Sequence, residues 1–277
     1  MTTALTASGI SVNFGAVQAL KGIGIEVGEG KLVGLIGPNG AGKTTFIDAI
    51  TGFVPAAGSI LLAGREISKL PPHDRARLGL ARTWQTIELF DDLSVLENLA
   101  VAARRPSIGS SLSEIVLGRE PRAEQLAEEA LAQLHIEDLA TAMPSDLPQG
   151  RRKLVGIARS LAARPSLLLL DEPAAGLDTN ESLDLGQRLR RVVDTGLSAL
   201  LVDHDMGLVR GICDELYVLD FGTVIGRGTP DEVWSNPDVL AAYLGASAAA
   251  EKREPEVVAA SADIAMQAVA AEGSDGQ

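Results

Sequence analysis

Eight consecutive residues, 37–44, carry the groups needed to hold a nucleoside triphosphate. They read Gly-Pro-Asn-Gly-Ala-Gly-Lys-Thr and separate an apolar run at 32–36 from an expected helix start. Glycines let consecutive backbone N–H groups converge on one anion, and the helix N-terminus adds the positive end of its dipole. Lys43 is placed to reach the outer phosphates, and the Thr44 hydroxyl to bind Mg²⁺. A phosphate-binding loop is therefore predicted, and a plain glycine-rich turn is the less favoured alternative. The residues expected at the nucleotide are Gly37, Pro38, Asn39, Gly40, Ala41, Gly42, Lys43, Thr44 and Thr45.

Two carboxylates follow a second apolar run, residues 167–170. The ends of such strands are where an open α/β sheet presents its ligand-binding groups. Asp171 suits Mg²⁺, which prefers oxygen ligands, and Glu172 is placed to polarise a water that attacks the γ-phosphate. For this segment alone, two solvated acids at a strand end are an equal alternative. Combined with the 37–44 motif, the pair predicts ATP hydrolysis with Mg²⁺.

These groups need a sheet and helices to position them. Early strand-like segments separated by glycines suggest an antiparallel β region beside the phosphate loop. They span residues 5–14, 24–27, 31–36 and 59–62.

From residue 93 to 146 the sequence becomes rich in alanine, leucine and glutamate, which indicates a helical subdomain. Ser94 and Glu97 have the spacing of a capping box, which predicts a helix start there. Another helix is expected over 124–134, with an apolar stripe on one face. The stripe comprises Leu126, Ala130, Leu131 and Leu134.

Beyond this region, apolar runs at 167–170 and 198–202 flank an expected helix at 181–194. This order is typical of central strands in a parallel sheet that is covered on both faces. A hairpin is expected from 217–220 and 223–225. Residues 246–277 are alanine-rich and acidic, which predicts a disordered or loosely helical tail.

Composition excludes several classes of function. The 277 residues carry a net charge of −13, which argues against binding to nucleic acid. A single cysteine, Cys213, excludes an internal disulfide framework and is expected in the core, and three scattered histidines give no zinc pattern. No signal-like N-terminus or apolar run of about 20 residues is present, so a membrane-spanning or secreted chain is not expected.

Over most of residues 5–245 the chain resembles the ATP-binding subunits of ABC transporters. Gln85 stands at the family's Q-loop position, which implies contact with Mg²⁺ and with the membrane partner. Asp178 lies in Ala-Gly-Leu-Asp, similar to the D-loop, and His204 stands where the family places a histidine that senses the γ-phosphate. Phe14 stands at the position of the aromatic residue that stacks on adenine. From the residues alone, a surface role for His204 and a core role for Phe14 stay open.

Within that family, residues 79–90, 219–233 and 241–245 resemble the branched-chain amino acid importers. The family signature, usually Leu-Ser-Gly-Gly-Gln, aligns with Leu147-Pro-Gln-Gly-Arg151. Gly150 is kept and implies contact with the γ-phosphate bound to an opposite subunit, but Pro148 replaces the serine and removes a hydroxyl and an N–H. Pro148 can still start a helix whose N-terminus faces an anion. For at least two of the three basic residues 151–153, a solvated surface is expected.

The resulting prediction is an α/β fold with a RecA-like P-loop ATPase core, an antiparallel β subdomain and an inserted helical subdomain at about 93–160. Residues 1–245 would form one ABC-type domain, with Lys43, Glu172 and His204 as its catalytic residues. The resemblance implies a head-to-tail dimer with an identical or sister subunit, transmembrane permease subunits as partners, and a peripheral place on the cytoplasmic face of the inner or plasma membrane.

Three alternatives compete with this prediction. A soluble, non-transport ABC ATPase would be expected to carry a coiled coil or a second cassette, and a GTPase would carry an Asn-Lys-x-Asp motif; neither is found. A regulatory ABC subunit with weak hydrolysis stays open.

Overall fold

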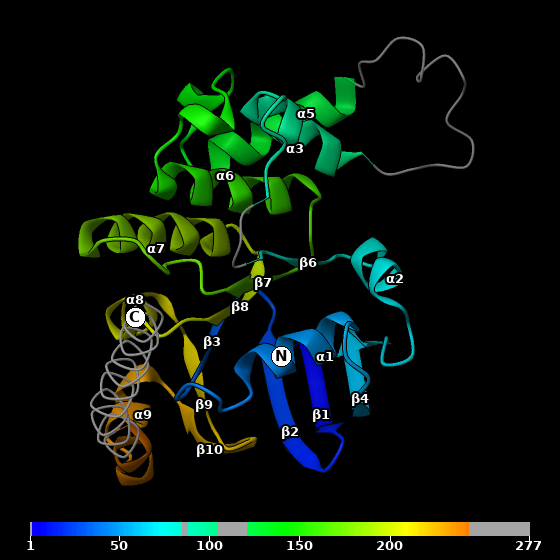
Figure 1. Ribbon diagram of the computed structural model, residues 1–277, viewed down its shortest axis with the longest axis vertical. Helices are drawn as coiled ribbons and strands as arrows, with labels where there is room; N and C mark the ends of the chain where they lie inside the picture. The colour runs from blue at the N-terminus through cyan, green and yellow to red at the C-terminus, as the bar shows by residue number, and fades with distance from the viewer. Residues whose placement is uncertain (1, 85–87, 105–120, 244–277) are drawn as a thin grey trace, which may run out of the picture.

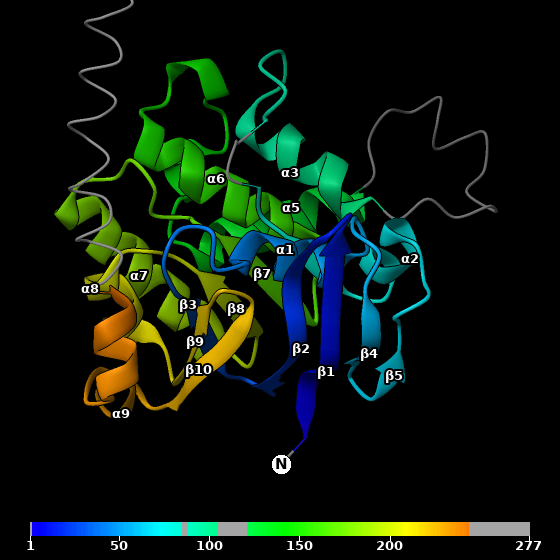
Figure 2. The same cartoon turned by 60° about the horizontal axis from the view of Figure 1, so that its bottom comes forward.

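The computed structural model describes residues 2–84, 88–104 and 121–243 of the chain. Two β-sheets and the helices packed on them make up this part (Figure 1). The antiparallel sheet has the order β2-β1-β4-β5, and β1, β2 and β4 stand side by side in the turned view of Figure 2. Its strands are β1 (Thr3–Phe14), β2 (Val17–Gly28), β4 (Ala57–Leu62) and β5 (Arg65–Glu66).

The second sheet has the order β10-β9-β3-β8-β7-β6. Its strands pair in parallel, except that β10 runs antiparallel to β9. The six strands are β3 (Leu32–Ile36), β6 (Leu80–Arg82), β7 (Leu167–Asp171), β8 (Ser198–Val202), β9 (Glu215–Asp220) and β10 (Thr223–Gly228). The prediction of a parallel sheet built on the two later apolar runs is confirmed.

The segment at residues 31–36 belongs to this parallel sheet, so its placement in the antiparallel region was wrong. All five residues of β3 are buried, and the strand pairs with β8 on one side and β9 on the other. A strand with neighbours on both edges and layers on both faces has no solvent-facing side. Its partners come more than 160 residues later in the chain, where local patterns give no information about pairing.

Helices cover both faces of the parallel sheet. α3 (Val95–Ala103), α5 (Pro121–Gln133) and α6 (Gln149–Ala162) pack on one another above it in Figure 1, and α7 (Thr179–Asp194) lies between them and the strands. α1 (Lys43–Thr51) lies on the opposite side, beside β1 and β2. The shorter helices are α2 (Pro72–Arg77), α8 (Met206–Ile212), α9 (Pro230–Trp234) and two 3₁₀ turns, Glu137–Leu139 and Pro144–Asp146.

Alternation along the central strands divides the core into two clusters. Leu168 and Leu170 of β7 face the α3, α5, α6 and α7 side, whereas Leu167 and Leu169 face the antiparallel sheet and α1. Successive side chains of a strand point to opposite faces, so burial on both sides requires the continuous apolar runs seen in the sequence.

Local signals explain where several helices begin. The predicted capping box of α3 is present: Glu97 N–H donates to the Ser94 hydroxyl, and the Glu97 carboxylate accepts from Ser94 N–H. Of the predicted stripe, Ala130, Leu131 and Leu134 are buried, and Leu126 is half-buried. Cys213 is buried, as expected, and burial raises its thiol pKa to about 12.

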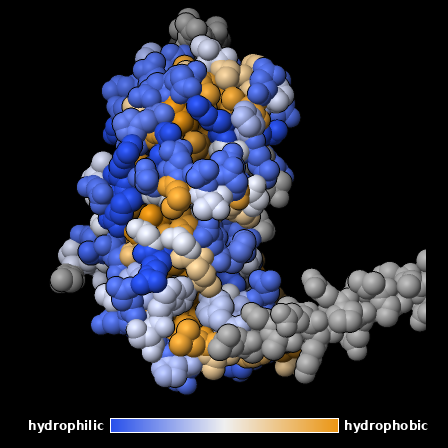
Figure 3. All heavy atoms as spheres, turned by 90° about the vertical axis from the view of Figure 1, so that its left-hand side faces the viewer, coloured by the Kyte–Doolittle hydropathy of each residue, from blue (hydrophilic) through white to orange (hydrophobic). Residues whose placement is uncertain are grey.

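Among the described residues, no helix combines the length and apolarity needed to cross a membrane. The face shown in Figure 3 is mainly hydrophilic, with small separate hydrophobic patches.

Candidate functional site

The loop 37–42 connects β3 to α1 and holds a shape that only glycine permits at two points. Gly37 has φ +149°, and a Cβ there would lie 2.0 Å from the Leu219 carbonyl oxygen. Gly42 has φ +107°, caps α1 and would bring a Cβ within 2.8 Å of the Leu20 side chain. The loop thus leads into the N-terminus of α1, where backbone N–H groups and the helix dipole favour an anion, and its binding of phosphate stays a prediction.

Lys43 is buried at the first position of α1, and its Nζ donates to the carbonyls of Gly37 (2.7 Å) and Pro38 (2.9 Å). Burial lowers the pKa of its ammonium, while Glu172 and Asp171 act to raise it. The carbonyls hold this cation at the mouth of the loop. A phosphate entering the cradle would meet a charge that is already in place.

The two carboxylates stand at the end of β7. Asp171 is 6% exposed, and Glu172 follows with φ +47°, a left-handed conformation that costs a non-glycine residue on the order of 1 kcal/mol. Glu172 N–H donates to the Val202 carbonyl at 2.7 Å, which fixes this turn to the end of β8. Asp171 thus ends β7 and Glu172 follows it directly, and the charges of both acids act to raise the pKa of Lys43.

Asp203 joins the loops after β7 and β8, and sequence reasoning missed it. Its carboxylate is buried and accepts the N–H groups of Ala174 (3.1 Å), His204 (2.7 Å) and Asp205 (2.9 Å). Those bonds hold the segment after Glu172 to the segment that carries His204, whose side chain is 62% exposed. A polar residue directly after an apolar strand was the signal available in the sequence.

Three further predicted residues have different surroundings. Phe14 is 52% exposed at the end of β1, so the alternative of a core phenylalanine is wrong. Asp178 caps α7, because its carboxylate accepts from Asn180 N–H and Glu181 N–H. Gln85 lies outside the described residues.

The segment aligned with the family signature forms the start of α6. Pro148 is the N-cap, with no side-chain cap, and Gly150 lies in the first turn. A Cβ at Gly150 would lie 2.7 Å from Glu181 Oε1, so this glycine lets the starts of α6 and α7 approach closely. In Figure 1, α6 and α1 belong to separate layers of the molecule.

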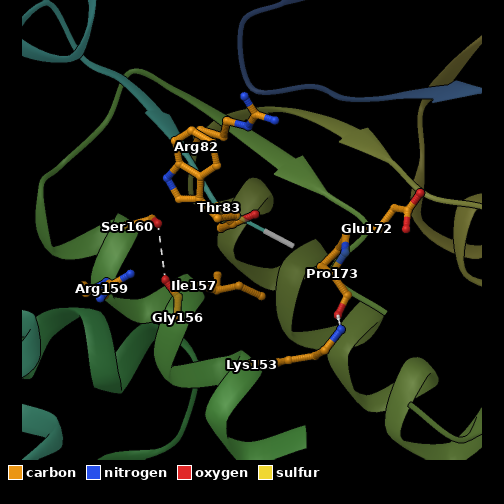
Figure 4. A pocket seen from close by; sticks show the side chains of 10 residues that line it. Arg82, Thr83, Lys153, Gly156, Ile157, Arg159, Ser160, Glu172 and Pro173 are labelled. Carbon is orange, nitrogen blue, oxygen red and sulfur yellow. Dashed lines mark hydrogen bonds between the residues drawn. The ribbon is translucent and has the colours of Figure 1, made fainter. Parts of the chain in front are cut away.

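The three basic residues after Gly150 differ. Arg151 pairs with Asp138 and Arg152 with Asp91 near the surface, as expected for two of the three. Lys153 is buried, its Nζ donates to the Pro173 carbonyl at 2.9 Å, and burial lowers its pKa against the opposing effects of Asp203 and Glu172. Figure 4 shows this bond crossing from α6 to the Glu172 turn. Lys153 thus links α6 to the turn that follows Asp171.

Arg82, at the end of β6, is a second site residue that the sequence did not predict. Its guanidinium lies between Asp48 Oδ1 (2.6 Å) and Asp171 Oδ2 (2.8 Å), and it stacks on the Trp84 ring at 4.4 Å. The two acids stand 34 and 89 positions away along the chain. No local pattern could have paired them.

Thr44, Asp171 and Arg82 line one cavity of about 900 Å³. A hydroxyl and a buried carboxylate facing a shared space are the oxygen donors that Mg²⁺ prefers. The residues present therefore fit a magnesium ion held together with a nucleotide phosphate.

The parallel sheet, the glycine cradle at α1 and the carboxylates after β7 define an ATP-binding cassette ATPase. The chain belongs to the ABC transporter family, which matches residues 20–175. Residues 223–249 match a second family, described as branched-chain amino acid ATP-binding cassette transporter.

Curated relatives agree with this assignment. LivG of Salmonella typhimurium and BraF of Pseudomonas aeruginosa, both named as high-affinity branched-chain amino acid transport ATP-binding proteins, are 38% identical over 248 residues. These matches span 87% of this chain and 97% of each relative. LptB of Escherichia coli, named as a lipopolysaccharide export system ATP-binding protein, is also 38% identical, over 243 residues.

Solved structures confirm the predicted fold class. The ADP conformation of an ATP-binding cassette from an ABC transporter superposes with a TM-score of 0.79 at 30% identity, covering 88% of this chain and 100% of the other. A nucleotide-free cassette gives 0.77 at 29% identity, covering 87% and 98%.

Proposed function

We propose that this chain hydrolyses ATP to drive a membrane permease that imports branched-chain or related amino acids. The observation that carries the hydrolytic part is the placement of Lys43 at the start of α1, with its Nζ held by the loop carbonyls, together with Asp171 and Glu172 at the end of β7, whose charges act to raise the Lys43 pKa. The cargo is supported by the match over residues 223–249 and by the names of LivG and BraF. Overall identity does not decide the cargo, because an export protein is equally similar.

Each residue of the site has a part in the reaction. The cradle N–H groups and Lys43 bind the phosphates, and Phe14 offers an exposed ring on which adenine can stack. Glu172 orients and deprotonates the attacking water, and His204 contacts the γ-phosphate from the neighbouring loop. Thr44, Asp171 and Gln85 would hold Mg²⁺, which would neutralise charge on the phosphates.

Two copies would assemble head to tail, with Gly150 and the start of α6 facing the nucleotide of the other copy, and Asp178 at the same junction. The exposed N-terminus of α6 supports this arrangement, because its N–H groups and dipole favour an anion. The partner copy is identical or a sister subunit. The pair would sit on the cytoplasmic face of the membrane, bound to transmembrane permease subunits, and would not bind nucleic acid.

The regulatory alternative, nucleotide binding with weak hydrolysis, is favoured by one observation, the Pro148 N-cap that lacks a side-chain hydrogen bond. Robust hydrolysis by the isolated chain would exclude it.

The test of the proposal uses Lys43→Ala. We expect loss of measurable ATP binding, because the only side-chain cation donating to the loop carbonyls among the described residues is removed, and loss of leucine, isoleucine and valine uptake in cells that depend on this chain. Isothermal titration and labelled amino acid uptake measure the two effects. Unchanged nucleotide affinity would refute the phosphate site, whereas lost binding with normal amino acid uptake would refute only the cargo. Proteins that co-purify from solubilised membranes identify the permease.

A further inference from the structure

The buried arginine beside the proposed metal ligand has no part in the function described above. Arg82 is 7% exposed at its side chain and lies between two carboxylates from different elements, Asp48 of α1 and Asp171 of β7. One guanidinium therefore serves two acids. Arg82 and Asp171 face the cavity that Thr44 also lines.

Mg²⁺ and Arg82 would use the same carboxylate. A guanidinium 2.8 Å from Asp171 Oδ2 neutralises much of the charge that attracts a metal ion, and two cations on one carboxylate repel each other strongly in a poorly solvated site. Asp48 offers the guanidinium a second anchor on the side of α1.

The surroundings of Arg82 allow it to move away from Asp171. Its Nε is buried and has no hydrogen-bond partner within the described part of the chain. This N–H group therefore does not anchor the guanidinium. Its other face rests on Trp84, which is 49% exposed and touches Phe53 edge to face at a centroid distance of 5.2 Å. A half-exposed ring can follow a shift of the guanidinium at little cost in packing.

We propose that Arg82 is the resident counter-cation of Asp171, a positioning residue that holds this carboxylate before Mg²⁺ arrives and competes with Mg²⁺ for it. This inference rests on the proposed function, since it takes Asp171 as the metal ligand. Arg82 thereby sets the Mg²⁺ concentration at which the nucleotide-loaded site binds the metal. The surroundings of the Trp84 ring, on which Arg82 stacks, change when Mg²⁺ replaces the guanidinium at Asp171.

The first measurement is the Mg²⁺ concentration that gives half of the rise in melting temperature at saturating ADP. For Arg82→Met we expect this midpoint to fall about tenfold or more, because Asp171 no longer shares its charge. Arg82→Lys keeps the cation and should stay near the wild-type midpoint. Asp48→Asn, the matched control, leaves Arg82 with Asp171 alone, so its midpoint should not fall.

A second measurement covers the case in which Arg82→Met fails to fold. The chain has two tryptophans, so Trp234→Phe leaves Trp84 as the only indole reporter. With ADP bound, added Mg²⁺ should change the Trp84 emission as Arg82 moves, and Arg82→Lys should reduce that change.

The outcomes separate the two claims. The inference would be overturned if the Mg²⁺ midpoint of Arg82→Met equals or exceeds that of the wild type, or if Trp84 emission does not change with Mg²⁺. Neither result would contradict the proposed ATP site. A wild-type melting temperature that responds to ADP and ignores Mg²⁺ would overturn the metal site and this inference together.

Discussion

At the scale of single residues, the site depends on buried charges that are held by backbone carbonyls. Lys43 and Lys153 each donate to main-chain oxygens, and both are placed near Glu172 in the electrostatic field of the site. Carbonyl partners keep a lysine in position without neutralising it. The cations thus stay available to an incoming phosphate or to a nearby carboxylate.

Glu172→Gln tests the assignment of the base. The amide keeps the shape and cannot accept a proton, so hydrolysis should fall about a hundredfold or more while ATP binding persists. Steady-state phosphate release and equilibrium nucleotide binding check the two halves, and an ATP-bound dimer should accumulate on gel filtration. Hydrolysis at the wild-type rate would mean that another group acts as the base.

Lys153→Met tests the link between α6 and the Glu172 turn. Loss of its bond to the Pro173 carbonyl removes roughly 0.5–1.5 kcal/mol of support, and we expect kcat to fall about three- to tenfold with KM for ATP little changed. Lys153→Arg retains a donor and should recover most of the rate. Equal loss in both variants would assign Lys153 to packing alone.

At the scale of elements, buried central strands were predictable and their partners were not. β7 and β8 are continuous apolar runs because other elements cover both faces of the sheet. Such a run can be recognised from a short stretch of sequence alone. β6 has three residues, too few for a periodic pattern, and β3 was assigned to the wrong sheet because pairing depends on distant strands. The ion pairs of Arg82 could not be predicted for the same reason, because Asp48 and Asp171 are distant from it in the sequence. The capping role of Asp178 is predictable from the sequence, since Asp178 and Glu181 have the spacing of a capping box.

The start of α6 gives an element-scale prediction. Pro148→Ser would place a hydroxyl at an N-cap that lacks a side-chain bond, and Pro148→Ala loses the same ring without adding a cap. We expect the serine variant to be more stable than the alanine variant by about 1 kcal/mol in denaturant unfolding. Its turnover should stay close to that of the wild type if Gly150 and the helix N-terminus supply the phosphate contacts. A tenfold or larger gain in turnover would instead mean that the native Pro148 sequence is a degenerate signature.

At the scale of the whole molecule, the predicted tail, residues 246–277, lies outside the described residues. Its alanine-rich, acidic composition still predicts that truncation after Gly245 leaves ATP turnover and melting temperature nearly unchanged. Phosphate release and thermal unfolding of the full and truncated chains provide the comparison. A drop of several degrees, or lost turnover, would show that the tail docks on the ATPase domain. The domain boundary at 245 and the helical subdomain at about 93–160 stay predictions.

Because its single cysteine is buried, this protein can be labelled selectively at a cysteine introduced elsewhere. Cys213 is 8% exposed and its thiol pKa is raised to about 12, so almost none of it is thiolate at neutral pH and maleimides should leave the native chain unmodified. A cysteine introduced at an exposed position such as Arg191 on α7 would then be the only reactive thiol. Pairs of spin labels attached there, one on each copy, would report the opening and closing of the proposed dimer by dipolar spectroscopy without first replacing the native cysteine.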